Sequence, residues 1–366
     1  MAKSRISIKD VCALAGVSAA TVSNVFSGRK PVNEALQKRV REAAATLGYQ
    51  PDRAASQLRS GRTNVVAVLV PDLTDAFFAT LVTRFEALAQ AEGYDVIVAS
   101  SRDNPAIEAS RLDALLAWRL AGVIAVPCSN EVPDALVAEA ARMPVVLVDR
   151  VAVPSAVADT VTIDNRDAGE VAARHLVEHG HRDIVLAASR LDILPIAERV
   201  EAAAEHIRRE TGCRATVLEL GTDVEKGASV FARWLERHPV PDAVMATTNV
   251  TTLSVLSAFA QFRIAVPDRA SIVAFDDYAW MSARNTGLTA IRQPLEEIAQ
   301  AAWARLRFRM EANAPAPPLS TVLDAGLVVR SSVSHRPPRP PARPEAAGMA
   351  GEAPDEAAQE TGPRVH

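Results

Sequence analysis

Polar side chains follow the short apolar, β-branched runs of residues 63 to about 333, at the point where each predicted strand ends. Asp, Asn and Thr are also common turn and N-cap residues, so any one of these positions could be purely structural. Their repeated placement is more typical of a ligand site, because open parallel sheets bind ligands beyond the carboxyl ends of their strands. The candidates are Asp72, Thr74, Phe77, Ser101, Arg102, Asp149, Arg150, Asn165, Thr248, Asn249, Asp276 and Trp280, with Asp277 beside Asp276.

The chemistry of these candidates favours a polyhydroxylated ligand. Carboxylates and amides accept and donate hydrogen bonds in the pairs that neighbouring hydroxyl groups require. Phe77 and Trp280 offer apolar faces against which a sugar ring could pack, while Arg102 and Arg150 leave room for a carboxylate or phosphate. The residues therefore predict a sugar or sugar acid rather than a purine or an amino acid.

Signatures of catalysis and of cofactor binding are missing from the sequence. It contains no G-x-x-x-x-G-K-[ST], no G-x-G-x-x-G after the first predicted strand and no G-x-S-x-G. His175 and His179 are four residues apart on a predicted helix, with His181 nearby, but no Cys or carboxylate stands at a persuasive spacing for a metal. We therefore expect no enzyme activity, no cofactor and no metal.

The elements that must position the candidates are alternating strands and helices. Apolar strands between amphipathic helices predict parallel sheets covered on both faces. The predicted strands are Val65–Val70, Asp95–Ala99, Val123–Val126, Val145–Val148, Val161–Ile163, Ile184–Ala187, Ala215–Glu219, Ala243–Ala246 and Ile272–Phe275. The predicted helices include Phe77–Gln90, Ala106–Trp118, Ala168–Glu178 and Val224–Arg237. So many strands indicate two subdomains whose sheets face each other across a cleft.

Residues 1–50 have a different character, basic and helical. Residues 1–62 contain eleven Lys and Arg against four Asp and Glu, whereas the whole chain has a net charge of −4, and a basic segment of this kind indicates a polyanionic partner. Ser7 and Ser18 are good N-caps, and Gly16 allows a tight turn between the first two helices. This pattern is typical of a DNA-binding helix-turn-helix, although short three-helix bundles also bind proteins.

Two further segments complete the predicted organisation. Residues 51–62 (PDRAASQLRSGR) form a connector that is too short for a stable lone helix in water, so it should be helical only with partners. Residues 334–366 are rich in Pro, Ala and Glu and lack aromatic residues, which predicts a disordered tail. The cysteines Cys12, Cys128 and Cys213 lie far apart, which argues against disulfides and indicates a reducing compartment.

Longer motifs resemble one known family. The segments are IKDVCALAGVSAATVSNVFSG at 8–28, LGYQPDRAASQLRSGRT at 47–63, PVVLVDR at 144–150, VTIDN at 161–165, HLVEHGHRDI at 175–184, PDAVMATTN at 241–249, VPDRASIVAFDD at 266–277, LTAIRQP at 288–294 and LVVRSS at 327–332. In this order and spacing they are similar to the LacI/GalR (lactose-repressor) family. The resemblance implies an all-α helix-turn-helix head and a periplasmic-binding-protein-like α/β core at 63–333, with crossovers near 161–164, 291–294 and 320–324.

The resemblance also implies roles for individual residues. It places the recognition helix at Ser18–Ser27, adds Arg199 to the effector site, and has Leu58 wedging into the minor groove of DNA. Asn24 can pair bidentately with adenine, and alanine methyl groups can contact thymine methyl groups. The implied DNA-binding residues are Ser18, Ala19, Ala20, Thr21, Ser23, Asn24, Arg29, Arg53 and Leu58. Many members have Asn-Asp where this chain has Thr248-Asn249, which weakens any transfer of a specific sugar.

We therefore expect a cytoplasmic, homodimeric transcriptional regulator, most simply a repressor, that reads a pseudo-palindromic operator in double-stranded DNA and responds to a sugar or sugar acid. A binding protein for uptake would share the core, but it would need a signal peptide and no DNA-binding head. A sugar-processing enzyme would need a catalytic constellation. No apolar run approaches the ~18 residues of a membrane span.

Overall fold

The computed structural model describes residues 6–27, 31–49, 63–152, 154–311 and 316–337. The head consists of three helices, α1 (Ile8–Ala15), α2 (Ala19–Ser27) and α3 (Glu34–Leu47). They pack on a small apolar core in which Val11, Val22 and Val40 are fully buried. Gly16 ends α1 with a φ of 63°, a conformation that glycine adopts without steric cost. The head is thus a three-helix unit in which two short helices precede a longer one.

The first subdomain of the core contains a six-stranded parallel sheet in the order β11-β5-β4-β3-β1-β2. Its strands are β1 (Val65–Val70), β2 (Asp95–Ser100), β3 (Gly122–Ala125), β4 (Val145–Val148), β5 (Asp159–Ile163) and β11 (Ser320–Leu323). Its helices are α5 (Ala76–Ala91), α6 (Pro105–Leu116), α7 (Asp134–Glu139) and α13 (Leu295–Glu311). The central strands are almost wholly apolar, as expected for strands that are buried on both faces.

The second subdomain repeats this plan with the strand order β12-β10-β9-β8-β6-β7, in which only β12 is antiparallel. Its strands are β6 (Asp183–Ala188), β7 (Arg214–Glu219), β8 (Ala243–Ala246), β9 (Ser271–Phe275), β10 (Thr289–Arg292) and β12 (Gly326–Val328). Its helices are α8 (Asn165–Glu178), α9 (Leu194–Arg209), α10 (Val224–Leu235), α11 (Asn249–Gln261) and α12 (Ala279–Ser282). The two sheets confirm the predicted fold class.

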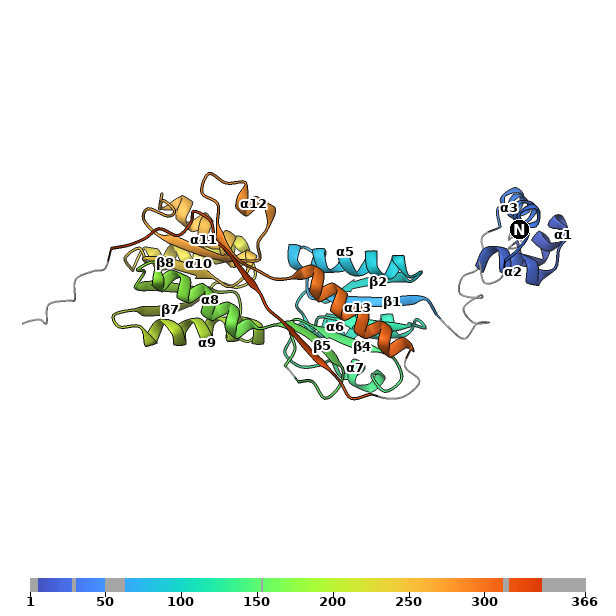
Figure 1. Cartoon of the computed structure of the whole chain (residues 1–366), viewed down its shortest axis with the longest axis horizontal. Coiled ribbons are helices and arrows are strands. Elements are labelled where there is room, and N and C mark those ends of the chain that lie inside the picture. Colours follow the sequence, from blue (N-terminus) through green and yellow to red (C-terminus); the bar gives the residue numbers. More distant parts are fainter. Residues whose placement is uncertain (1–5, 28–30, 50–62, 153, 312–315, 338–366) are drawn as a thin grey trace, which may run out of the picture.

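The chain passes between the two sheets three times, after β5, after β10 and between β11 and β12. Helix α13 follows a strand of the second subdomain yet packs beside α5 on the first, as Figure 1 shows. The Asp159 carboxylate, fully buried at the start of β5, accepts hydrogen bonds from Arg305 and Arg309 of α13 and from the Leu319 amide. These bonds fasten the returning segment to the first sheet.

The strands of both subdomains end near the crossovers, so their carboxyl ends face each other. The helices that follow begin at polar caps, because unpaired N–H groups at a helix start need acceptors. The capping side chains include those of Asp75, Asn104, Asp164, Asp223 and Thr248. Among the candidate site residues, Thr248 therefore serves as a cap, the structural alternative that the sequence also allows.

Candidate ligand pocket and DNA-binding head

A pocket lies between the two subdomains, where the carboxyl ends of the strands meet. The space between its walls is about 500 Å³, part of which is open solvent. Both subdomains contribute to its wall, which combines aromatic rings with charged and hydroxyl groups, as small-molecule sites commonly do. The lining residues are Asp75, Phe77, Phe78, Asp149, Arg150, Ser189, Arg190, Ile193, Pro195, Ile196, Arg199, Thr222, Thr248, Asp276 and Gln293.

The predicted effector residues divide into two groups. Those brought together in the pocket wall are Phe77, Asp149, Arg150, Arg199, Thr248 and Asp276. Those outside the wall are Asp72, Thr74, Ser101, Arg102, Asn165, Asn249 and Trp280. Asp72 and Thr74 bind each other in the loop after β1, where the Thr74 amide and hydroxyl donate to the Asp72 carboxylate at 2.8 Å each. The polar groups of Asp72 and Thr74 therefore stabilise a turn.

The other residues outside the wall have different surroundings. Arg102 is exposed, whereas Ser101 is fully buried. Trp280 packs against the apolar cluster around Met281 and Leu288. Asn165 is buried, and its Oδ1 accepts a 2.9 Å hydrogen bond from Arg199 Nε, so it supports a wall residue from behind.

Asp276 is a buried acid of the pocket wall whose pKa is strongly raised. Burial raises its pKa to about 6, although Arg199 beside it favours the charged form. Its backbone is in the left-handed region, with a φ of 64°, which is unusual for a residue with a side chain. Gln293 Nε2 donates to Oδ1 at 2.7 Å, and the Asn249 amide donates to Oδ2 at 3.4 Å. These hydrogen bonds hold the carboxylate in place, but they do not fully offset the cost of burying its negative charge.

Unmatched acceptors accompany Asp276. Two buried oxygens have no hydrogen-bond partner among the described residues: Gln293 Oε1, which belongs to the pocket wall, and Asn249 Oδ1, whose residue lies outside the wall. Asp149, also at a positive φ of 65°, has a pKa raised by burial, and no described side chain donates to its carboxylate. Buried acceptors without donors are costly, so this site is suited to a ligand that brings several hydrogen-bond donors.

Arg199 is the buried cation of the pocket wall and is 3% exposed. Its guanidinium lies 3.8 Å from the centre of the Phe275 ring, and Nη1 donates to the Thr247 carbonyl at 2.8 Å. Gly169 of α8 makes this position possible, because a Cβ there would lie 2.2 Å from the Arg199 carbonyl oxygen. The close approach of α8 and α9 therefore sets where the guanidinium sits.

Two further arginines reach the wall in ion pairs. Arg150 pairs with Asp103, and Arg190 donates to both oxygens of Asp192 at 2.9 and 2.6 Å. Arg190 and Ser189 follow β6 directly, so the strand-end argument could have found them from the sequence. Gln293 was missed because β10 was not among the predicted strands. Phe78 lies beside the predicted Phe77, just beyond the end of the first strand, whereas Asp75, Thr222 and the apolar residues at 193, 195 and 196 carried no separate signal.

The head presents the exposed side of α2. Ser18, Ala19 and Ala20 are exposed, while Thr21, Ser23 and Asn24 are partly buried. Ser18 Oγ accepts from the Thr21 amide at 3.2 Å, so it caps the helix. The other implied DNA-binding residues, Arg29, Arg53 and Leu58, lie outside the described residues.

Neither a metal centre nor a membrane span emerges from the described residues. Within them, no group of three or more His, Cys, Asp and Glu side chains could hold a metal ion. The rings of His175 and His179 are tilted at 46° to each other with centres 4.2 Å apart, and burial lowers the pKa of His175. No helix in the described part of the chain has the length and apolar content needed to cross a membrane.

Comparisons with known proteins agree with this architecture. The profile described as "Bacterial regulatory proteins, lacI family" matches residues 7–52, and "Periplasmic binding protein-like domain" matches residues 173–333. The regulator PtxS of Pseudomonas putida is 31% identical over 332 residues, which cover 90% of this chain and 96% of that protein. The regulator GalR of Escherichia coli is 29% identical and covers 89% and 95% of the two chains.

Solved structures show the same arrangement. A lac repressor dimer bound to operator and the anti-inducer ONPF matches with a TM-score of 0.78 and 25% identity, covering 90% of this chain and all of that one. A CelR–cellobiose complex matches with a TM-score of 0.66 and 28% identity, over 90% of this chain. Since the similarity to PtxS extends over nine tenths of the sequence and the head matches the family profile, the chain belongs to the lacI family of bacterial regulatory proteins.

Proposed function

We propose that this protein is a ligand-controlled transcriptional regulator, a repressor that binds operator DNA through its head and a sugar or sugar acid in the pocket between its subdomains. The main evidence for this class of ligand is a set of hydrogen-bond acceptors that lack donors, beside the Arg199 guanidinium. These acceptors are the Asp149 carboxylate and the buried oxygens near Asp276. Vicinal hydroxyl groups supply the donors that these oxygens lack, and a planar guanidinium suits two neighbouring ligand oxygens.

The aromatic wall supports the same class. Phe77 and Phe78 are buried at the start of α5 and meet edge to face, with ring centres 5.1 Å apart. They give the pocket wall an apolar part, which suits the faces of a sugar ring, and the Arg150 guanidinium lies over the Phe78 ring at 5.4 Å from its centre. The related regulator CelR forms a complex with the sugar cellobiose. We infer that binding here is not followed by chemistry, since the related proteins are regulators.

The DNA-binding part of the proposal rests on α2 and the connector. We propose that Ala19, Ala20 and Asn24 face base edges in the major groove and that Leu58 wedges into the minor groove. Ser18, Thr21, Ser23, Arg29 and Arg53 would contact or support contacts to phosphates. A homodimer would place two heads on a pseudo-palindromic site. The related lac repressor has been solved as a dimer bound to operator.

The DNA part is tested by selecting genomic fragments that the purified protein retains and measuring their affinity by anisotropy. Leu58→Ala should weaken binding of the selected operator strongly, while Leu14→Ala, on the exposed side of α1, should not. Equal operator affinity of Leu58→Ala and the unaltered protein would show that the wedge assignment is mistaken.

The ligand part is tested by thermal shift with paired aldoses and aldonic acids, including D-glucose and D-gluconate. A ligand that binds only the folded protein raises the unfolding temperature. We expect stabilisation by at least one sugar or sugar acid, and its loss in Arg199→Ala. A panel that stabilises neither protein, or both equally, would contradict the proposed pocket chemistry.

A further inference from the structure

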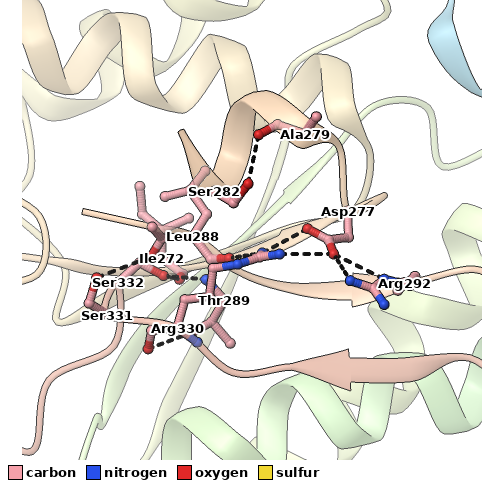
Figure 2. A network of polar contacts seen from close by, with 11 residues as sticks. Ile272, Asp277, Ala279, Ser282, Leu288, Thr289, Arg292, Arg330, Ser331 and Ser332 are labelled. Carbon is pink, nitrogen blue, oxygen red and sulfur yellow. Dashed lines mark hydrogen bonds and ion pairs between the residues drawn. The ribbon is translucent and has the colours of Figure 1, made fainter. Parts of the chain in front are cut away.

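Two consecutive carboxylates, Asp276 and Asp277, follow strand β9 and face different surroundings. Asp276 lines the pocket, whereas Asp277 lies outside the pocket wall, in the polar network shown in Figure 2. The side chain of Asp277 is only 3% exposed. A buried carboxylate outside the binding site needs an explanation, because isolated buried charge is strongly unfavourable.

The explanation begins with two arginines that enclose Asp277. Arg330 donates from Nη1 to Oδ1 at 2.7 Å and from Nη2 to Oδ2 at 3.0 Å, a bidentate arrangement. Arg292 Nε donates to Oδ2 at 3.0 Å from the other side. Arg330 Nη1 also donates to the Leu288 carbonyl at 2.7 Å. The three charged side chains form one connected cluster, drawn in Figure 2, which we term the Asp277 cluster.

The two arginines come from segments that are far apart in the sequence and adjoin the crossovers. Arg292 is the last residue of β10, immediately before the chain crosses to α13. Arg330 lies just beyond β12, the first strand after the crossover from β11. Ser332 also joins the segment after β12 to β9 and β10. Its hydroxyl donates to the Ile272 carbonyl at 2.6 Å and accepts from the Thr289 amide at 2.8 Å.

The same segments hold the pocket acid. Gln293, next to Arg292, donates to the Asp276 carboxylate, and the Asp276 amide donates to the Ile291 carbonyl at 2.9 Å. The left-handed φ of Asp276 is sterically unfavourable, so the surrounding bonds must maintain it. The consecutive residues Asp276 and Asp277 are therefore bonded to consecutive residues of the second crossover, Asp276 to Gln293 and Asp277 to Arg292.

We propose that Asp277 is a positioning residue for the ligand pocket. The Asp277 cluster joins the second and third crossovers to the end of β9, and thereby holds Asp276 and Gln293 in place on the pocket wall. Any movement of the subdomains about these crossovers acts on the pocket through this cluster. The link to ligand binding rests on the proposed function of the pocket, whereas the mechanical role of the cluster does not.

A matched control separates positioning from general stabilisation. Asp183, at the start of β6, accepts two hydrogen bonds from Arg214, at 3.2 and 2.8 Å. This pair belongs to the same sheet but lies at the amino ends of its strands, remote from the crossovers. Asp183→Asn therefore removes a second arginine–carboxylate pair of the same sheet, one that is more exposed than the Arg330–Asp277 pair, without touching the Asp277 cluster.

The experiment is hydrogen exchange by mass spectrometry on the ligand-free protein with Asp277→Asn, Asp183→Asn and the milder Arg292→Gln, whose side chain is already 57% exposed. We expect Asp277→Asn to speed exchange in peptides spanning 276–281 and 291–298 roughly tenfold, the scale of coupling within one hydrogen-bond network. Arg292→Gln should change the same peptides less, and Asp183→Asn should leave them unchanged. Unaltered exchange there in Asp277→Asn, or equal effects of the control, would overturn the proposal.

Thermal shift with D-glucose and D-gluconate supplies the functional readout. If either sugar stabilises the unaltered protein, Asp277→Asn should weaken its affinity about tenfold, while Asp183→Asn should bind it normally. Normal affinity in Asp277→Asn would overturn the positioning role. The same comparison applies to any other member of the panel of aldoses and aldonic acids. If no member stabilises the unaltered protein, the proposed sugar chemistry fails, and the exchange data alone decide the role of the cluster.

Discussion

Replacing Asp276 by Asn should stabilise the ligand-free protein, whereas the same replacement at Asp277 should destabilise it. Burial raises the pKa of Asp276 to about 6 from an ordinary value of 3.8. By contrast, hydrogen bonds from Arg330 and Arg292 hold the pKa of Asp277 below its ordinary value. Ionisation of Asp276 therefore lowers the stability of the folded protein, whereas ionisation of Asp277 raises it.

The magnitude for Asp276 follows from that shift. A change of roughly 2 pKa units corresponds to about 3 kcal/mol at neutral pH, with the attraction of Arg199 already included. Asparagine keeps one acceptor for Gln293, loses the long bond from the Asn249 amide and tolerates the left-handed backbone better than most residues. Allowing about 1 kcal/mol for the lost bond, we expect a net gain of about 2 kcal/mol.

For Asp277 the sign is reversed. Asparagine cannot neutralise two guanidinium groups, and removing one partner of a buried ion pair commonly costs about 3–5 kcal/mol. Arg292 is more than half exposed and can be hydrated instead, so we expect a loss nearer 2–3 kcal/mol.

The pH dependence separates the two variants further. The folded pKa of Asp276 is raised, so its unfavourable effect on stability grows as pH rises from about 4 to about 6. The gain in Asp276→Asn should therefore be small near pH 4 and complete above pH 6. The folded pKa of Asp277 is lowered, so its stabilising effect is present above pH 3.8 and is lost as pH falls below that value. The loss in Asp277→Asn should be largest at neutral pH.

Scanning calorimetry at about pH 4.5 and pH 7 measures both effects. For a subdomain of this size, 2 kcal/mol corresponds to a shift in the unfolding temperature of roughly 4–8 °C. The reasoning would be refuted if Asp276→Asn lowered the unfolding temperature at neutral pH, or if both variants shifted it in the same direction.

Two further predictions concern the buried arginine. Arg199→Lys keeps the charge but loses the planar fork, so calorimetric titration with a sugar that binds the unaltered protein should show about tenfold or greater loss of affinity; undiminished affinity would remove Arg199 from the site. Gly169→Ala places a Cβ 2.2 Å from the Arg199 carbonyl oxygen, which forces α8 and α9 apart. It should destabilise the protein by about 1–3 kcal/mol and weaken the same ligand, and unchanged unfolding in urea would contradict the packing argument.

The sequence predicts the elements well where the apolar pattern is strong. The predicted strand Val65–Val70 is observed with the same bounds, and the predicted helix Phe77–Gln90 is observed as Ala76–Ala91. Strand β10 was missed because Thr289–Arg292 is short and ends in an exposed arginine, so its pattern is not distinct from a loop. With β10 unseen, Gln293 could not be placed beside the pocket.

The position of a residue at a strand end does not predict the direction in which its side chain points. Asp276 and Asp277 occupy the same sequence context, yet one lines the pocket and the other forms the Asp277 cluster. The difference depends on the backbone conformation at Asp276 and on Arg330, which is 53 residues from Asp277 in the sequence. Such long-range contacts leave no periodic pattern, and only the folded chain brings them together.

The central claim is that ligand in the pocket controls binding of DNA by the head. Its most direct test is the affinity of the selected operator fragment, measured by anisotropy with and without each stabilising sugar, for the unaltered protein and for Arg199→Lys. We predict that the sugar changes operator affinity roughly 5- to 150-fold in the unaltered protein, the usual range of coupling between sites. Arg199→Lys should bind the operator normally without sugar and respond far less to it. An operator affinity that no stabilising sugar alters, or an equal response in both proteins, would contradict the claim.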